Sequence, residues 1–172
     1  YLITTLGFAS ALTFPVFLGV AMVGEELIEL VLGSKWVEIS GLFAVIAVSV
    51  PLRILAYVIS PAMLAAGGAR INMTNAFITL IFFTAAIFAL LPLGLFGVGI
   101  AWSLGSVCIF VLTAVRGGRL LGLALKAILF SIFPALFAAL MMCTVIYAID
   151  LLLSNVSGII ALYKIPLGGL VY

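Results

Sequence analysis

Arg53 is the residue whose chemistry stands out, because it is the one charged side chain in the apolar run 39–67. If this run is helical, residues at i−4, i+4 and i+7 share its face, and they are Ser49, Tyr57 and Ser60. A guanidinium donates paired, charge-assisted hydrogen bonds to phosphate and carboxylate groups. The stripe predicts a polar cavity beside this helix, with these four residues as candidate binding residues.

A structural role for Arg53 carries equal weight. A charge at bilayer depth costs at least about 2.5 kcal/mol on insertion scales, so it usually faces a partner. That partner is either an anionic ligand, an acid elsewhere in the protein, or backbone carbonyl groups left exposed beside Pro51. Both roles require that Arg53 face the interior of the protein.

A second polar stripe lies on the next apolar segment, at Asn72, Asn75 and Thr79. The amide of Asn75 is a candidate for binding sugar hydroxyl groups. Hydrogen bonding to a neighbouring helix is the favoured interpretation, because amides commonly pair in this way inside membranes.

The composition excludes most other chemistry. Of the 172 residues, 67% are apolar and 7% are charged, so an ordinary soluble domain is excluded. A net charge of +2 is too small for a nucleic-acid-binding surface. With no histidine and a single aspartate, we expect no metal, no cofactor and no enzyme active site. Cys108 and Cys143 lie in apolar runs and indicate small buried side chains.

The charge-free runs are long enough to cross a membrane, which takes about 20 apolar residues. As one helix, residues 71–115 would measure about 67 Å, twice the hydrocarbon core, so the chain must turn back at Pro92–Gly97. We predict an all-α integral membrane bundle with five spans, then a break at 154–158 and the start of a sixth span. The predicted spans are 6–24, 39–66, 71–91, 96–115 and 126–149, with a partial one at 165–172.

Two shorter patterns refine this bundle. Residues 25–36 mix apolar and acidic side chains and predict a short helix at the membrane interface that ends at Gly33. Small residues recur in the span 96–115 and predict close helix packing; they are Gly99, Ala101, Ser103, Gly105 and Ser106.

The charged connections predict the orientation. The connection after the second predicted span carries Arg70, and the one after the fourth carries Arg116, Arg119 and Lys126. The first connection, residues 25–38, is mainly acidic. Because short cytoplasmic loops carry the excess of Lys and Arg, we expect the basic connections in the cytoplasm and the acidic one outside.

Four stretches resemble bacterial polysaccharide flippases. Residues 31–36 (VLGSKW) are similar to the family's LLG-x-x-W, residues 61–70 (PAMLAAGGAR) to its P-x-L-x-A-x-G-x-x-R, and residues 92–105 (PLGLFGVGIAWSLG) to its P-x-G-x-x-G-x-A hairpin. Residues 119–122 (RLLG) resemble the charged turn that follows. Over essentially the whole chain, the order and spacing resemble the Wzx-type polysaccharide biosynthesis proteins of the multidrug/oligosaccharidyl-lipid/polysaccharide exporter superfamily.

This resemblance implies the C-terminal lobe of a two-lobed transporter in the bacterial cytoplasmic (inner) membrane. The implied substrate is a glycan linked to undecaprenyl diphosphate, flipped for lipopolysaccharide or exopolysaccharide export, and Arg53 would contact its diphosphate or an acidic sugar. The implied partners are membrane lipid and the N-terminal lobe of the same protein, with no nucleic acid.

Two other functions stay open at this point. A multidrug or toxin antiporter of the same superfamily would need an acid-lined pocket, but the predicted spans contain no acid. A membrane scaffold or an integral membrane transferase is the third possibility. A transferase would need catalytic acids near the interface, and only the cluster at 25–38 comes close.

Overall fold

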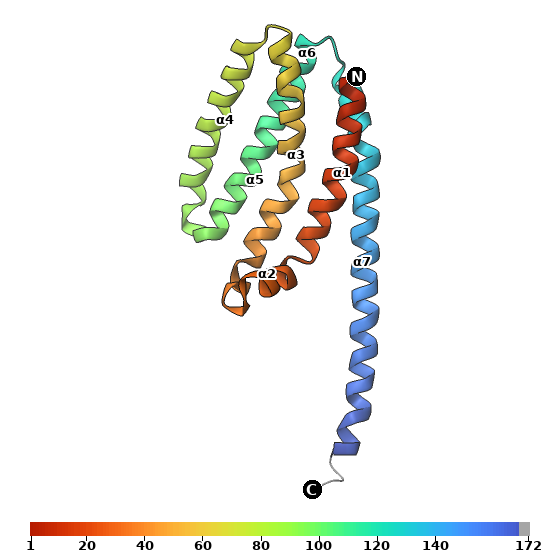
Figure 1. Ribbon diagram of the computed structural model, residues 1–172. Coiled ribbons are helices and arrows are strands. Elements are labelled where there is room, and N and C mark those ends of the chain that lie inside the picture. The colour runs from red at the N-terminus through yellow and green to blue at the C-terminus, as the bar shows by residue number, and fades with distance from the viewer. Residues whose placement is uncertain (169–172) are drawn as a thin grey trace.

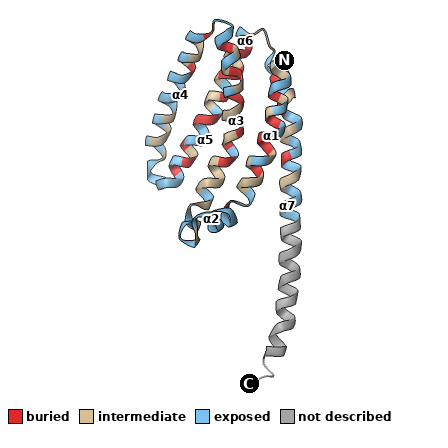
Figure 2. Ribbon diagram, viewed as in Figure 1, coloured by how far each residue is buried: buried red, intermediate tan, exposed pale blue. Residues whose placement is uncertain are grey.

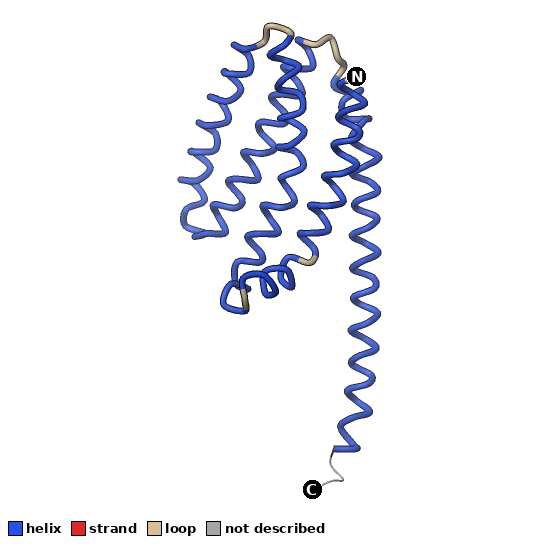
Figure 3. Tube along the Cα trace, in the orientation of Figure 1, coloured by secondary structure: helices blue, strands red, loops and turns tan. Residues whose placement is uncertain are grey.

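The computed structural model describes the backbone of residues 1–168 and the side chains up to Ala148. These residues form helices and short connections, with no strand among them (Figure 3). The α-helices are α1 (Leu2–Met22), α2 (Gly24–Leu32), α3 (Ser40–Ala65), α4 (Ala69–Leu90), α5 (Gly94–Leu112), α6 (Gly118–Leu120) and α7 (Leu125–Gly168). Two 3-10 segments, η1 (Ser34–Ile39) and η2 (Leu91–Leu93), and one π-helix, η3 (Thr113–Gly117), connect them. The predicted all-α architecture is confirmed.

The five long helices lie side by side in the order α4, α5, α3, α1 and α7 (Figure 1). Helix α1 packs against both α7 and α3, α3 packs against α5, and α5 packs against α4. Helices α3 and α4 contact each other much less than each contacts α5. Helix α5 therefore lies between them and forms the floor of the space that separates α3 from α4.

The hydrophobic core lies between α1 and its two neighbours α3 and α7, and it extends to Phe110 of α5 and Ala114 of η3. Leu55, Ile59 and Met63 recur at helical spacing on α3 and are fully or almost fully buried, together with Leu6 of α1 and Ile128 of α7. Figure 2 shows the buried residues concentrated on the inner helices, whereas α4 is largely exposed. The exposed residues of α4 are mostly apolar, which suits a surface that faces lipid rather than water.

The small residues of α5 pack closely, as the sequence predicted. Gly99, Ala101, Gly105 and Ser106 are buried. A methyl group on Gly105 would lie 3.3 Å from the ring of Phe83 in α4, so glycine lets the two helices approach. Ser103 donates a hydrogen bond to the carbonyl oxygen of Val45 at 2.9 Å, which links α5 to α3.

Within the described residues, four helical segments are long and apolar enough to cross a membrane: Leu2–Met22, Ser34–Ala65, Ala69–Leu120 and Leu125–Ala148. The third segment contains both α4 and α5, which form the two arms of a hairpin in Figure 1. The turn between them includes Pro92 and Gly94, whose φ of 64° suits glycine. The turn that the sequence predicted in 92–97 is therefore present, and the four candidate spans indicate a multi-pass membrane protein.

The short helix predicted after the first span is present as α2. Its residues Glu25 and Glu26 lie in the first turn, where negative charge interacts favourably with the helix dipole. The helix ends at Gly33, which has a φ of 90°. Figure 1 places α2 at the opposite end of the bundle from α6 and the α3–α4 turn.

The predicted break at 154–158 is absent from the structure. A break at 154–158 followed by a partial span at 165–172 was expected, but α7 continues without interruption from Leu125 to Gly168. Ser, Asn and a single Gly each lower helix stability by only about 1 kcal/mol or less, so such a cluster does not have to end a helix. Residues 169–172 lie outside the described part of the chain.

Candidate functional site

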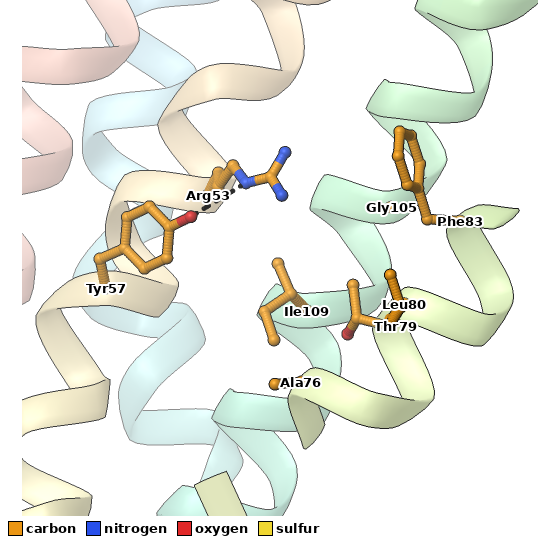
Figure 4. Close-up of a pocket in the computed structure, with 8 residues that line it drawn as sticks. All are labelled: Arg53, Tyr57, Ala76, Thr79, Leu80, Phe83, Gly105 and Ile109. Atoms are coloured by element: carbon orange, nitrogen blue, oxygen red, sulfur yellow. Dashed lines mark hydrogen bonds between the residues drawn. The ribbon is translucent and has the colours of Figure 1, made fainter. Parts of the chain in front are cut away.

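A groove runs between α3 and α4, and α5 forms its floor. Its central pocket has a volume of about 260 Å³ and receives residues from all three helices (Figure 4). Arg53 and Tyr57 come from α3, Gly105 and Ile109 come from α5, and α4 supplies the opposite wall. The residues of that wall are Ala76, Thr79, Leu80 and Phe83.

The positive charge of this pocket is that of Arg53, which lies near the middle of the bundle. It lies 12 and 13 residues from the ends of α3, or about 18 to 20 Å of helix from either end. Its Nε donates a hydrogen bond to the hydroxyl oxygen of Tyr57 at 3.2 Å. Figure 4 shows the guanidinium pointing away from α3 into the groove. Among the described residues, its two Nη groups have no hydrogen-bond partner.

Two aromatic side chains complete the setting of Arg53. The Cζ atom of Arg53 lies 4.0 Å from the ring centroid of Trp102 on α5, a cation–π contact. Trp102 in turn meets Phe83 of α4 edge-to-face, with ring centroids 5.8 Å apart. One face of the guanidinium is thus covered, and its Nε is bonded to the exposed Tyr57, while the Nη donors still face the groove.

The groove continues into a second pocket of about 150 Å³. Both pockets are lined by Tyr57, Ala76 and Ile109, so they are parts of one groove. The second pocket also contains Ser60 of α3, whose hydroxyl donates to the Oδ1 atom of Asn72 on α4 at 3.0 Å. This hydrogen bond joins the two walls of the groove.

Helix α4 buries only two of its residues, Asn75 and Thr79, and both are polar. Arg116, in the π-helix η3, donates from Nη1 to the Oδ1 atom of Asn75 at 2.9 Å. The Nδ2 atom of Asn75 and the hydroxyl of Thr79 have no hydrogen-bond partner among the described residues. A buried polar group without a partner costs about 1 to 3 kcal/mol, so a further polar partner at this position would stabilise the helix.

The predicted site residues are distributed unevenly. Arg53 and Tyr57 line the central pocket, Ser60 lines the adjoining one, and Asn75 is buried beside them on α4. Ser49 lines neither pocket; it is buried, and its hydroxyl donates to the carbonyl oxygen of Ile46 in its own helix at 2.8 Å.

The sequence reasoning missed Trp102 and the role of Arg116. A signal for Trp102 existed, because it lies in the middle of α5, whereas tryptophans of membrane helices usually gather near the interface. Arg116 was assigned to a connecting loop, but the structure places it half-buried in η3. Its contact with Asn75 spans 41 residues of sequence, so no local pattern indicates it.

No carboxylate lines either pocket. The acids whose side chains are described lie on α2 and η1, at the far end of the bundle from α6; they are Glu25, Glu26, Glu29 and Glu38. No group of three or more metal-binding side chains is present in the described part of the chain. The groove therefore offers one cation, neutral hydrogen-bonding groups and aromatic rings.

Comparison with known proteins gives no relative: no protein-family model, no curated protein and no solved structure matches this chain.

Proposed function

We propose that this chain belongs to a flippase that moves a lipid-diphosphate-linked oligosaccharide across the membrane for cell-surface polysaccharide biosynthesis. The observation that carries the proposal is Arg53, a guanidinium halfway along a candidate membrane-spanning helix, held by Tyr57 and Trp102, with its Nη donors facing a groove. Such a fork matches phosphate oxygens in both geometry and charge.

The other lining groups favour an anionic, hydroxyl-bearing ligand over a cationic drug. A cationic drug would be stabilised by a carboxylate in the pocket, and neither pocket is lined by one. Hydroxyl and amide groups at Ser60 and Asn72 suit sugar hydroxyls, because each can both donate and accept. The groove thus supports the flippase over a multidrug antiporter of the same superfamily.

The surroundings of the groove fit a transporter of two lobes. Its walls and floor come from α3, α4 and α5, with Thr113 of η3 at one end, and the groove has an open side. An N-terminal lobe of the same protein would cover that side, and the undecaprenyl chain would lie in the surrounding lipid of the bacterial inner membrane. The sequence stretches at 31–36, 61–70, 92–105 and 119–122 support the same assignment.

A transport assay with two substrates tests the proposal. The full-length protein is reconstituted into vesicles that contain either a fluorescent undecaprenyl-diphosphate-linked oligosaccharide or a hydrophobic fluorescent cation. We expect the oligosaccharide to become accessible to an external glycosidase much faster than in protein-free vesicles, while the cation is not moved. Movement of the cation alone would replace the flippase by the antiporter, and movement of neither would contradict both.

A further inference from the structure

The charged group and the neutral Ser60–Asn72 pair lie at different positions along the groove. Arg53 holds the charge near mid-bundle, and Ser60 lies seven residues further along α3, about 10 Å closer to the α3–α4 turn. Asn72 lies near the start of α4, at the same end. In the other direction, the contact between Phe83 and Trp102 brings α4 and α5 together beside Arg53. Ser60 and Asn72 therefore lie on the side of the α3–α4 turn, and the Phe83–Trp102 pair lies on the other side of Arg53.

The Ser60–Asn72 pair has hydrogen-bonding capacity that its own bond leaves unused. With Oδ1 of Asn72 accepting from Ser60, the Nδ2 group still carries two donors, and the Ser60 oxygen still carries lone pairs. A neighbouring donor and acceptor match a hydroxyl group, which needs both. They match a phosphate poorly, because an ionised phosphate has no donor for the Ser60 oxygen. They match an acyl chain poorly, because it would leave both the donor and the acceptor without a hydrogen bond.

Two buried side chains on α4 extend this set. Thr79 lines the central pocket together with Arg53, and its hydroxyl is unpartnered among the described residues. Asn75 lies between Asn72 and Thr79, and its Oδ1 accepts a hydrogen bond from Arg116. Because arginine carries donors only, this contact fixes the orientation of the amide, and Nδ2 is a buried donor behind the residues that line the groove. Thr79 therefore lines the same pocket as Arg53, and Ser60 and Asn72 line the adjoining pocket nearer the α3–α4 turn.

We propose that Ser60, Asn72 and Thr79, with Asn75 behind them, form a neutral subsite that binds the sugar attached to the anionic group at Arg53. The ligand then lies along the groove with its phosphate at mid-bundle and its first sugars toward the α3–α4 turn and Arg116. This inference rests on the proposed function, because it takes Arg53 as the anion site. It adds the direction of the ligand and the residues that distinguish a glycosylated lipid from a bare one.

Binding of two lipids to the full-length protein in detergent tests the subsite: undecaprenyl diphosphate, and the same lipid carrying a disaccharide. We expect Ser60→Ala combined with Asn72→Leu to weaken binding of the disaccharide lipid by about tenfold and to leave the bare lipid unchanged. Arg53→Ala should weaken both lipids. Ser49→Ala is the control on the same helix, since its hydroxyl bonds only within α3.

A second variant tests the same subsite independently, in case the first variant does not fold. Thr79→Val keeps the shape of the side chain and removes its hydroxyl, and Thr13→Val is its control, because Thr13 has the same 8% exposure and bonds only within α1. Thr79→Val should weaken only the disaccharide lipid, and Thr13→Val neither. If the groove variants left the preference for the disaccharide lipid unchanged while Arg53→Ala weakened both lipids, the subsite would be wrong and the anion site would stand. If the unmutated protein bound neither lipid, the proposed function would fall and the subsite with it.

Discussion

At the scale of single residues, the environment of Arg53 explains how a charge is accommodated in the middle of a membrane bundle. Tyr57 accepts one of its five N–H donors, and the ring of Trp102 covers one face of the guanidinium. Both contacts lower the cost of the charge without neutralising it. The remaining donors are therefore held ready for an anion, and little side-chain entropy is lost when one binds.

Trp102 is the residue that tests this preorganisation. Trp102→Ala removes the cation–π contact, which is worth about 0.5 to 2 kcal/mol, so we expect about 2- to 30-fold weaker binding of undecaprenyl diphosphate. Trp102→Phe keeps a smaller aromatic face and should lose less. Titration of the detergent-solubilised protein with the lipid measures both variants. Equal affinities for the alanine variant and the unmutated protein would show that the ring does not position Arg53.

At the scale of elements, the groove depends on the hairpin of α4 and α5. These helices approach closely because Gly97 and Gly105 have no side chain where Leu90 and Phe83 pass. Helix α4 contacts α3 little, and the hydrogen bond between Ser60 and Asn72 links the two helices, which both pack mainly on α5. The width of the groove is therefore set by the contact of each wall with α5.

Gly97→Ala tests this dependence. The added methyl group would collide with the backbone carbonyl group of Leu90, and a backbone contact is not relieved by turning a side chain. We expect the variant to lose about 1 to 3 kcal/mol of stability, the usual cost of overpacking, and to unfold at a lower temperature in detergent. Gly7→Ala is the matched control, because its methyl group would lie an ordinary 3.7 Å from the carbonyl oxygen of Ser131. Equal unfolding temperatures for the two variants would contradict the close packing of the hairpin.

At the scale of the whole molecule, charge separates the two ends of the bundle. The start of α4, η3 and α6 carry Arg70, Arg116 and Arg119, whereas α2 and η1 at the other end carry four glutamates and one lysine, Lys35 (Figure 1). The positive-inside rule predicts that the end with more Lys and Arg faces the cytoplasm. If the basic end is cytoplasmic, the neutral part of the groove lies on the side from which a newly made glycan would arrive.

Cysteine labelling in intact cells tests this orientation. Single cysteines are introduced as Arg119→Cys and Glu26→Cys after Cys108 and Cys143 have been replaced by serine. We expect a membrane-impermeant maleimide to label position 26 in intact cells and position 119 only after the membrane is made permeable. The reverse pattern would place the acidic end in the cytoplasm.

Much of this fold was predictable from the sequence. The predicted span 39–66 became Ser40–Ala65 and the span 71–91 became Ala69–Leu90, because proline, glycine and charge mark where apolar helices end. The continuous α7 was missed because polar residues and one glycine weaken a helix without ending it.

The site was only partly predictable, for a different reason. A helix that is apolar on every side gives no pattern that says which face meets which neighbour. The spacing of Arg53, Tyr57 and Ser60 placed them on one side of α3, and the structure puts them in one groove. Their partners Trp102 and Asn72 come from other helices, so only the packing of the bundle brings them together.

The most direct test of the account is to exchange Arg53 in the full-length protein and follow lipid-linked oligosaccharide in the outer leaflet of living cells, with membrane abundance measured in parallel. The account predicts that Arg53→Ala is present at normal abundance and loses translocation by more than about tenfold, since a charge-assisted fork to phosphate is lost. Arg53→Lys should keep part of the activity, because it keeps the charge without the fork. Normal translocation by Arg53→Ala at normal abundance, or a loss that only follows lower abundance, would contradict the central claim and make Arg53 a structural residue.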